Sequence, residues 1–191
     1  MVQLPEPVKK DSEGAKAGFS TIDQIGMERI IRAARKIKED NNDATADLGF
    51  RHYTLAEPSS TTLDKLEQFS PDDNGMFVSN TILEEFGVAT VLATWLVRDG
   101  YGFTAPVVAV DFAGYTGYYM GKHLYLIAQD LSNEAIASIT EKYETDGAFN
   151  PENVVLFGYS FKWTEMESLK TNLARLKDTE KNLRINFDIR Y

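Results

Sequence analysis

The chain has 191 residues, of which 43% are hydrophobic, so it can bury one core or two small ones and is not disordered throughout. Its formal net charge is −9, which excludes a free-standing DNA-binding protein whose whole surface is basic. The sequence has no cysteine, which excludes disulfides, thiolate zinc sites and cysteine nucleophiles.

The first segment alternates like a strand and then meets two prolines. Val2-Gln3-Leu4 has the alternation, and Pro5 and Pro7 cannot donate to a sheet ladder, so the strand ends quickly. Glu6 lies between the prolines. It is either a solvent-exposed side chain or, at the end of a strand beside a cofactor, an acceptor for ribose hydroxyls.

The next segment predicts a helix. Apolar residues recur at helical spacing from Ile22 to Ile37, Thr21 can cap the start, and Asn41-Asn42 can end it. We expect this apolar stripe to lie in a core. The opposite face is basic and contains Arg29, Arg32, Arg35, Lys36 and Lys38. It is either a surface for phosphates or a partner, or an ordinary solvated helix face.

A strand and a linker are predicted after this helix. Residues 49–55 alternate like a strand, and His52 within it is expected to be structural or exposed rather than a metal ligand. The composition of Glu57–Asn80 is typical of turns, with a short helical piece at Thr62–Phe69. We place a domain boundary at residues 57–76.

The most apolar helix is predicted between Asn80 and Asp99, with Ser79 or Asn80 as its cap. Its pattern is apolar over most of its circumference, which indicates burial. The apolar run Gly87–Val97 is too short to span a bilayer, and the N-terminus lacks the apolar core of a signal peptide. We therefore expect a cytoplasmic protein with no membrane contact.

The rest of the chain predicts an α/β domain with a mixed sheet. The order β-β-β-α-β-α-β indicates helices packed on that sheet. The helix before the last strand is expected to begin with a capping box of Thr164 and Glu167 and to run to about Lys177. The predicted elements are strands at Pro106–Phe112, Tyr115–Met120 and His123–Ala128, a helix at Ser132–Glu144, a strand at Asn153–Phe157, that helix, and a last strand at Leu183–Ile189.

Several stretches of the chain resemble one protein family. They are E-R-I-I-R-A-A-R-K-I-K followed by D-L-G-F-R, the upstream segments Val2–Pro7 and Lys16–Phe19, and Ser168–Asn172 near the C-terminus. On these residues the chain resembles the C-terminal part of the adenine-specific DNA methyltransferase subunit of type III restriction–modification systems. The similarity runs almost end to end along this chain.

The resemblance implies two parts. Residues 1–56 would be the tail of a Rossmann-like, S-adenosylmethionine-binding methyltransferase sheet, with Glu6 as the cofactor-binding residue. Residues 77–191 would be a C-terminal α/β domain that serves subunit contact. The parent enzyme would transfer a methyl group from S-adenosylmethionine to N6 of adenine in a short asymmetric DNA site.

The catalytic parts of that family are missing from the sequence. Its catalytic motif is an acidic or polar residue followed by Pro-Pro and an aromatic residue, which holds the flipped adenine, and this chain has no Pro-Pro pair. Asp111–Gly117 is similar to the D-x-F-x-G-x-G cofactor loop of methyltransferases. Its spacing differs, however, and a strand pattern follows it, so we predict a hairpin turn there.

We therefore expect a C-terminal part of a methyltransferase subunit that is inactive alone, has no catalytic or metal-binding residue of its own, and does not bind S-adenosylmethionine tightly. The expected partners are the rest of the methyltransferase, a second modification subunit and the restriction subunit. DNA would be contacted only within that assembly, and DNA or partner contact is expected at Arg29, Arg32, Arg35 and Lys36.

The alternative is a free-standing protein-interaction module that binds a methyltransferase or restriction subunit. In either case, the strands and the isoleucine stripe of residues 1–56 would lack neighbours. Isolated strand sets are marginal in water, so we expect self-association, or local disorder before about residue 45.

Overall fold

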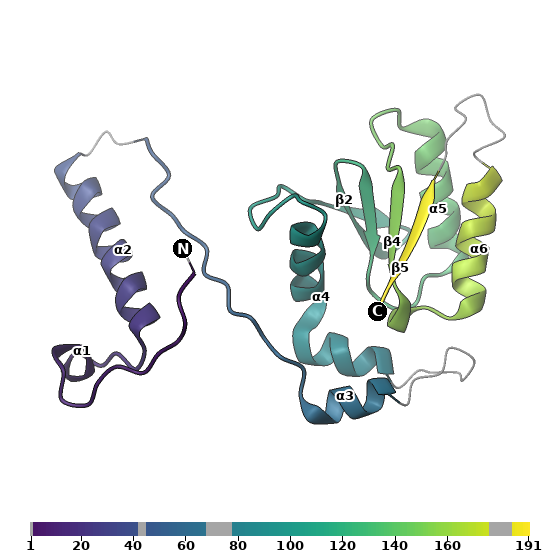
Figure 1. Cartoon of the computed structure of the whole chain (residues 1–191). Coiled ribbons are helices and arrows are strands. Elements are labelled where there is room, and N and C mark those ends of the chain that lie inside the picture. The colour runs from purple at the N-terminus through teal and green to yellow at the C-terminus, as the bar shows by residue number, and fades with distance from the viewer. Residues whose placement is uncertain (1, 42–44, 68–77, 176–184) are drawn as a thin grey trace. The chain divides into compact units, whose positions relative to one another are not determined.

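The computed structural model describes residues 2–41, 45–67, 78–175 and 185–191, and the chain forms two compact units, Met1–Leu55 and Ala56–Tyr191 (Figure 1). Among the described residues, no helix is both long and apolar enough to cross a membrane. The first unit is helical, whereas the second contains a five-stranded sheet with helices on both faces. The α/β class predicted from the sequence is confirmed.

The first unit contains a short helix and the long helix that the apolar spacing predicts. Helix α1 spans Glu13–Lys16, and the Ser12 hydroxyl accepts a hydrogen bond from the backbone nitrogen of Ala15 at its start. Helix α2 spans Ile22–Asp40, with Thr21 and Asn41 at its two cap positions. The Thr21 side chain makes no capping hydrogen bond, so the position of the cap was predicted correctly but its chemistry was not.

Two strands predicted for the first unit do not form. Residues 2–4 and 50–55 have no strand assignment, and the ladder-like contact of this unit is the single bridge between Pro7 and Thr21. An extended segment becomes a strand only when a neighbouring segment accepts and donates its backbone hydrogen bonds. Within the described part of this unit, no strand ladder is assigned to either segment.

The apolar stripe of α2 is not buried within the first unit, contrary to the prediction that it lies in a core. No residue of α2 is buried, and the exposed fractions of Ile22, Ile30 and Ile37 are 41%, 38% and 43%. Ile25 is half-buried, since its side chain approaches Gly14 of α1. Most of the stripe is therefore open in this unit.

The sheet of the second unit has the strand order β1-β2-β3-β4-β5. Strands β1, β2 and β3 pair antiparallel, and β3, β4 and β5 pair parallel, so the predicted mixed sheet is confirmed. The predicted start of the last strand, Leu183, falls within residues 176–184 and so lies outside the described residues. The strands are β1 Val108–Phe112, β2 Tyr115–Met120, β3 His123–Leu126, β4 Asn153–Phe157 and β5 Asn186–Arg190.

Each face of the sheet is covered by helices, which gives two core layers (Figure 1). One layer includes Leu124 and Leu156 of the sheet and lies under α5 and α6. The other includes Tyr125 and Phe157 and lies under α4. The helices are α3 Ser60–Glu67, α4 Val78–Arg98, α5 Asn133–Thr145 and α6 Trp163–Ala174, with a 3-10 turn at Gly158–Ser160.

Two details of the predicted helices are corrected. Helix α6 begins one residue before the predicted Thr164, because Glu165 at its third position accepts a hydrogen bond from the Lys162 backbone nitrogen, so the predicted capping box with Glu167 is wrong. Helix α4 is less buried than predicted, since Leu92, Trp95 and Leu96 are buried but Val97 is 38% exposed. Helix α4 already includes Ser79 and Asn80, so the predicted cap at either residue is wrong.

Candidate functional site

The residues predicted for cofactor, DNA or partner contact all lie in the first unit. Glu6 is exposed in the extended segment before α1, and its backbone oxygen accepts a hydrogen bond from Ile22 at the start of α2. All the predicted basic contact residues are exposed, and Arg32 pairs with Glu28 one turn earlier at 2.7 Å. They are Arg29, Arg32, Arg35 and Lys36.

These residues are not gathered into one site. The backbone of Glu6 meets the first residue of α2, whereas Arg29 lies seven residues further on, which is about 10 Å along a helix. Lys36 lies about two further turns away. The basic residues therefore form a stripe along α2 that leads away from Glu6.

The segment similar to a cofactor loop is a hairpin turn. Asp111 is the second-last residue of β1 and Gly117 lies in β2, and the two residues between these strands, Ala113 and Gly114, have φ angles of 52° and 90°. This is the geometry of a tight two-residue hairpin. The Asp111 carboxylate accepts a hydrogen bond from the Gly114 backbone nitrogen at 3.3 Å, so it stabilises the turn. The predicted hairpin is confirmed.

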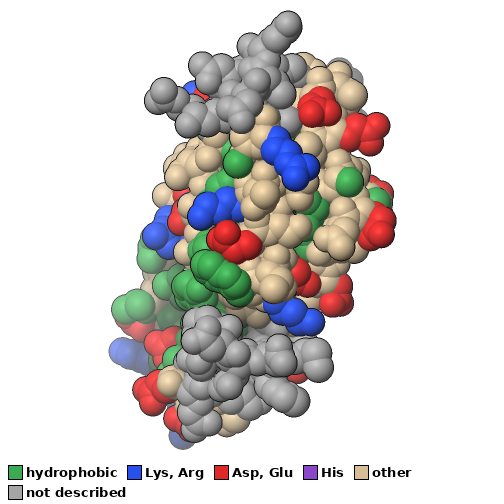
Figure 2. Space-filling view, turned by 90° about the vertical axis from the view of Figure 1, so that its right-hand side faces the viewer, with side chains coloured by type: hydrophobic (Ala, Val, Ile, Leu, Met, Phe, Trp, Pro, Cys, Tyr) green, Lys and Arg blue, Asp and Glu red, His purple; other side chains and the backbone are tan. Residues whose placement is uncertain are grey.

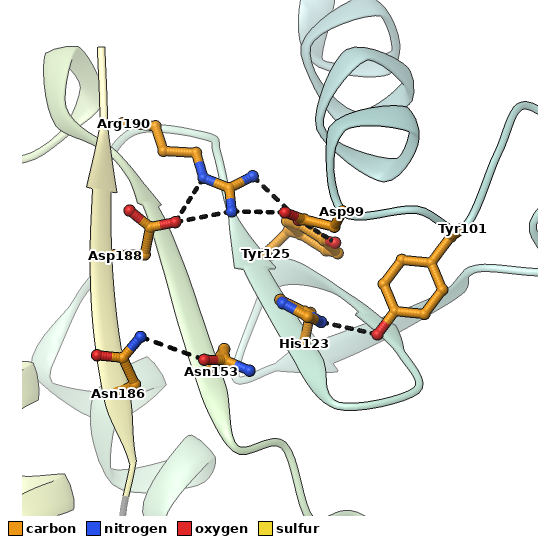
Figure 3. A network of polar contacts seen from close by, with 8 residues as sticks. All are labelled: Asp99, Tyr101, His123, Tyr125, Asn153, Asn186, Asp188 and Arg190. Carbon is orange, nitrogen blue, oxygen red and sulfur yellow. Dashed lines mark hydrogen bonds and ion pairs between the residues drawn. The ribbon is translucent and has the colours of Figure 1, made fainter.

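The most developed polar cluster of the second unit joins the end of α4 to the last strand (Figure 3). The Arg190 guanidinium donates to both carboxylate oxygens of Asp99, through Nη2 at 2.8 Å and Nη1 at 3.0 Å. Its Nε donates to Asp188 at 2.7 Å, and the Tyr125 hydroxyl donates to Asp99 at 2.7 Å. We call these four residues the Arg190 clasp.

The central pair of the clasp is almost fully removed from water. The exposed fractions of the Arg190 and Asp99 side chains are 6% and 10%, and the guanidinium carbon lies 5.5 Å from the ring centroid of Trp95. Burial raises the pKa of Asp99, but the hydrogen bonds from Arg190 and Tyr125 outweigh it, so the pKa of Asp99 lies below its ordinary value. Burial and the bond to Asp99 raise the pKa of Tyr125.

The clasp is a structural device rather than a reaction centre. Every guanidinium nitrogen of Arg190 and both carboxylate oxygens of Asp99 already have partners within the chain. A catalytic acid or base needs an open position within reach of a substrate. In the described residues, no group of three or more acidic or histidine side chains could hold a metal ion. The clasp therefore ties β5 to α4.

A row of polar side chains continues from the clasp across the same face of the sheet. His123, Asn153 and Asn186 are register neighbours on β3, β4 and β5, and Asn186 donates to Asn153 at 3.2 Å. The His123 ring lies 2.7 Å from the Tyr101 hydroxyl (Figure 3). His123 and Asn153 are partly buried and Asn186 is exposed, so the row reaches the protein surface at β5.

The sequence contained a weak signal for the clasp. The last strand places Asn186, Asp188 and Arg190 on one face, with opposite charges two residues apart. The local pattern does not identify the partner of this face, because that partner lies 91 residues away.

The clasp predicts acid sensitivity of folding. A carboxylate whose pKa is lower in the folded state than in the unfolded state stabilises the fold above its unfolded pKa, and this stabilisation is lost as pH falls through the folded pKa. For Asp99 the loss begins below about pH 4. Urea unfolding of the wild type and of Asp99→Asn between pH 7 and pH 3 should show the steeper loss in the wild type. Parallel pH profiles of the two proteins would contradict this assignment.

Comparison with known proteins connects this fold to one family. Residues 86–183 match the family described as the type III R-M EcoP15I C-terminal domain. The chain is 32% identical over 206 residues to the StyLTI Mod subunit of the type III restriction-modification enzyme from Salmonella typhimurium, and 33% identical over 185 residues to the EcoP15I Mod subunit from Escherichia coli. It is 28% identical over 185 residues to the EcoPI Mod subunit of Escherichia phage P1.

The matches cover nearly all of this chain but a minor part of each relative. They include 94% of the chain and 31% of the StyLTI subunit, and 95% of the chain with 27% and 28% of the other two subunits. The chain therefore spans about a third or less of the length of these relatives. The resemblance inferred from the sequence is confirmed.

Proposed function

Because this chain belongs to the family of type III restriction–modification C-terminal domains, we propose that it works by contact within a modification assembly and not by catalysis. The observation that carries this proposal is the closed architecture of the second unit. Its sheet is covered on both faces, and its best-organised polar cluster is satisfied internally. Such a unit is suited to present a surface rather than to perform a reaction.

The distribution of charge supports a protein partner for the second unit. Residues 1–55 contain nine basic and nine acidic side chains, which cancel, whereas residues 56–191 contain eleven basic and twenty acidic side chains, which leave the whole −9. On the face shown in Figure 2, charges of both signs are interspersed among hydrophobic side chains. DNA repels a surface of this net charge. We infer that the second unit contacts protein.

The first unit carries the proposed connection to methyl transfer. In the parent enzyme we propose S-adenosylmethionine-dependent methylation of adenine N6 in DNA, with Glu6 beside the cofactor ribose. The α2 stripe of Arg29, Arg32, Arg35 and Lys36 would face DNA phosphates or a partner, since all four side chains are exposed on one helix. The isolated chain would bind the cofactor weakly and would be inactive.

The proposed partners are the rest of a methyltransferase, a second modification subunit and a restriction subunit, in the cytoplasm. The open stripe of α2 supports such an assembly, since exposed isoleucines at helical spacing are stabilised by a covering surface. Self-association of the chain through this stripe remains a prediction.

A second candidate is a free-standing interaction module. The observation that favours it is the two-layered core that the described part of residues 56–191 forms, which gives this unit the means to fold without further chain. In this case the same surfaces would bind an intact methyltransferase or restriction subunit from another gene.

The two candidates are separated by the reading frame upstream of the Met1 codon in the source DNA. An open frame that encodes a D-x-F-x-G-x-G loop, and further back a Pro-Pro-aromatic motif, is expected for the C-terminal part of a modification subunit. A stop codon followed by a ribosome-binding site would contradict that proposal and support the module.

A further inference from the structure

Helix α4 contains a sharp backbone irregularity at Gly87. This residue has φ 76° and ψ 158°, whereas the residues on either side are helical. That region of backbone space is almost restricted to glycine. The irregularity therefore divides α4 into residues 78–86 and residues 88–98, and Figure 1 shows the resulting change of direction.

Gly87 is not required there for lack of space. A Cβ atom built at this position meets nothing within 4 Å. A side chain at residue 87 would therefore be opposed by the backbone conformation alone. If Gly87 took helical angles, residues 78–98 would form one continuous helix.

The part of α4 before the bend carries α3 with it. The Glu85 carboxylate accepts hydrogen bonds from the Ser59 backbone nitrogen at 2.9 Å and from the Thr62 hydroxyl. Both groups lie at the start of α3, and Thr62 is buried with an exposed fraction of 3%. Glu85 thus joins α3 to the first part of α4. We call α3 and residues 78–86 the lever.

Two partly buried side chains of the lever pack against the rest of the second unit. Ile82 and Leu83 pack against the core layer under α4 but stay only partly buried. Among the described side chains of α4, residues 82–98, the buried ones begin at Leu92, on the other side of Gly87. The family match starts at residue 86, so most of the lever lies before the matched domain.

We propose that Gly87 is a hinge, about which the lever moves as one body between the bent arrangement and a straight, continuous α4. Straightening restores helical hydrogen bonds across residue 87 and relieves the positive φ, while it gives up the packing of Ile82 and Leu83. The bent state is the ground state of the free chain. A partner that covers these two side chains would favour the straight state.

Substitutions at the hinge can favour either state. Gly87→Ala disfavours the positive φ and favours the helix, which together shift the straight-to-bent ratio by roughly 30- to 100-fold. Val88→Pro favours the bent state, because a helix that starts after Gly87 accepts proline at its first position, whereas a continuous helix does not. The two variants should therefore act in opposite directions.

The test is a spin-label distance between the lever and the sheet domain. The labels are attached after the substitutions Asp64→Cys in α3 and Glu141→Cys in α5, both at exposed positions. Because the chain has no cysteine of its own, the labels react at these two positions only. Pulsed electron paramagnetic resonance should give a single distance between the two spin labels, both with residue 87 unchanged and in Val88→Pro. In Gly87→Ala it should show a second distance, displaced on the order of 10 Å, because the moving arm is nine residues of helix.

Two further variants complete the experiment. Gly114→Ala places the same substitution at φ 90° in the hairpin, also with nothing within 4 Å, and should leave the distance unchanged. Ile82→Ala with Leu83→Ala loosens the lever without altering residue 87 and should also produce the second distance, even if Gly87→Ala does not fold. A single wild-type distance in both Gly87→Ala and the Ile82 and Leu83 variant would overturn the hinge.

Discussion

Replacement of Arg190 by alanine should cost about 3–5 kcal/mol in the free energy of unfolding. The substitution leaves the Asp99 carboxylate, whose side chain is only 10% exposed, without the two charge-assisted hydrogen bonds from the guanidinium. It also removes the cation that lies over the Trp95 ring. Since a domain is stable by about 5–15 kcal/mol in total, this loss should be visible as a large drop in the urea midpoint.

Two controls distinguish the buried clasp from an ordinary ion pair. Lys122→Ala breaks the exposed pair between Lys122 and Glu152, 2.6 Å apart, and should change the urea midpoint far less than Arg190→Ala does, because water screens this pair. Arg190→Met combined with Asp99→Asn removes both charges and should be less destabilised than Arg190→Ala alone. If Arg190→Ala and Lys122→Ala lost equal stability, the proposed importance of the clasp would be wrong.

Leu156→Ala should lower the free energy of unfolding by about 2–5 kcal/mol. Leu156 lies on β4, inside the five-stranded sheet, and is 1% exposed in the layer under α5 and α6. Removing its three outer carbons leaves a cavity that packed neighbours on both sides can only partly fill. Chemical denaturation followed by tryptophan fluorescence measures the loss.

Ile189 provides the matched control for this core substitution. It is the register neighbour of Leu156 on β5 and lies on the same face of the sheet, but its exposed fraction is 39%. Ile189→Ala should therefore cost clearly less than Leu156→Ala, because less apolar area leaves contact with the protein. Equal losses would mean that Ile189 at the β5 edge is covered in solution, which would contradict its exposed fraction of 39%.

The sequence predicted the second unit well because its signals are local. The strands at Tyr115–Met120 and Asn153–Phe157 have the predicted bounds, since alternation, apolar runs and turn residues all agree there. The hairpin at Ala113-Gly114 was identified from the same kind of signal. The beginning of α6 was missed because Thr164 and Glu167 offered a better capping pattern than Lys162 and Glu165, which the chain uses.

Long-range features could not be predicted in the same way. The partner of Arg190 lies 91 residues away, and no residue near Arg190 in the sequence identifies it. The bend at Gly87 was hidden because glycine inside an apolar helical pattern is compatible with an unbroken helix. In the first unit, residues 50–55 alternate like a strand but form none. A strand also needs a second segment to pair with, and the local pattern does not identify one.

The two units differ in how much of their apolar and charged surface is covered within the chain. The second unit has a complete core and an internally satisfied polar cluster, and it carries the net negative charge of the chain. The first unit has an open apolar stripe and an exposed basic face on one helix. Both descriptions favour surfaces for assembly, and neither gathers the predicted Glu6 and basic residues around a common centre.

Whether the chain acts by contact or by catalysis is decided by a methyl-transfer assay with the purified 191-residue chain. The chain is incubated with tritiated S-adenosylmethionine and double-stranded DNA of mixed sequence, and adenine N6 methylation is measured against a buffer control and an active type III modification enzyme. We predict no transfer above the buffer control. Methylation of adenine by the chain alone would contradict the proposal that it works by contact and not by catalysis.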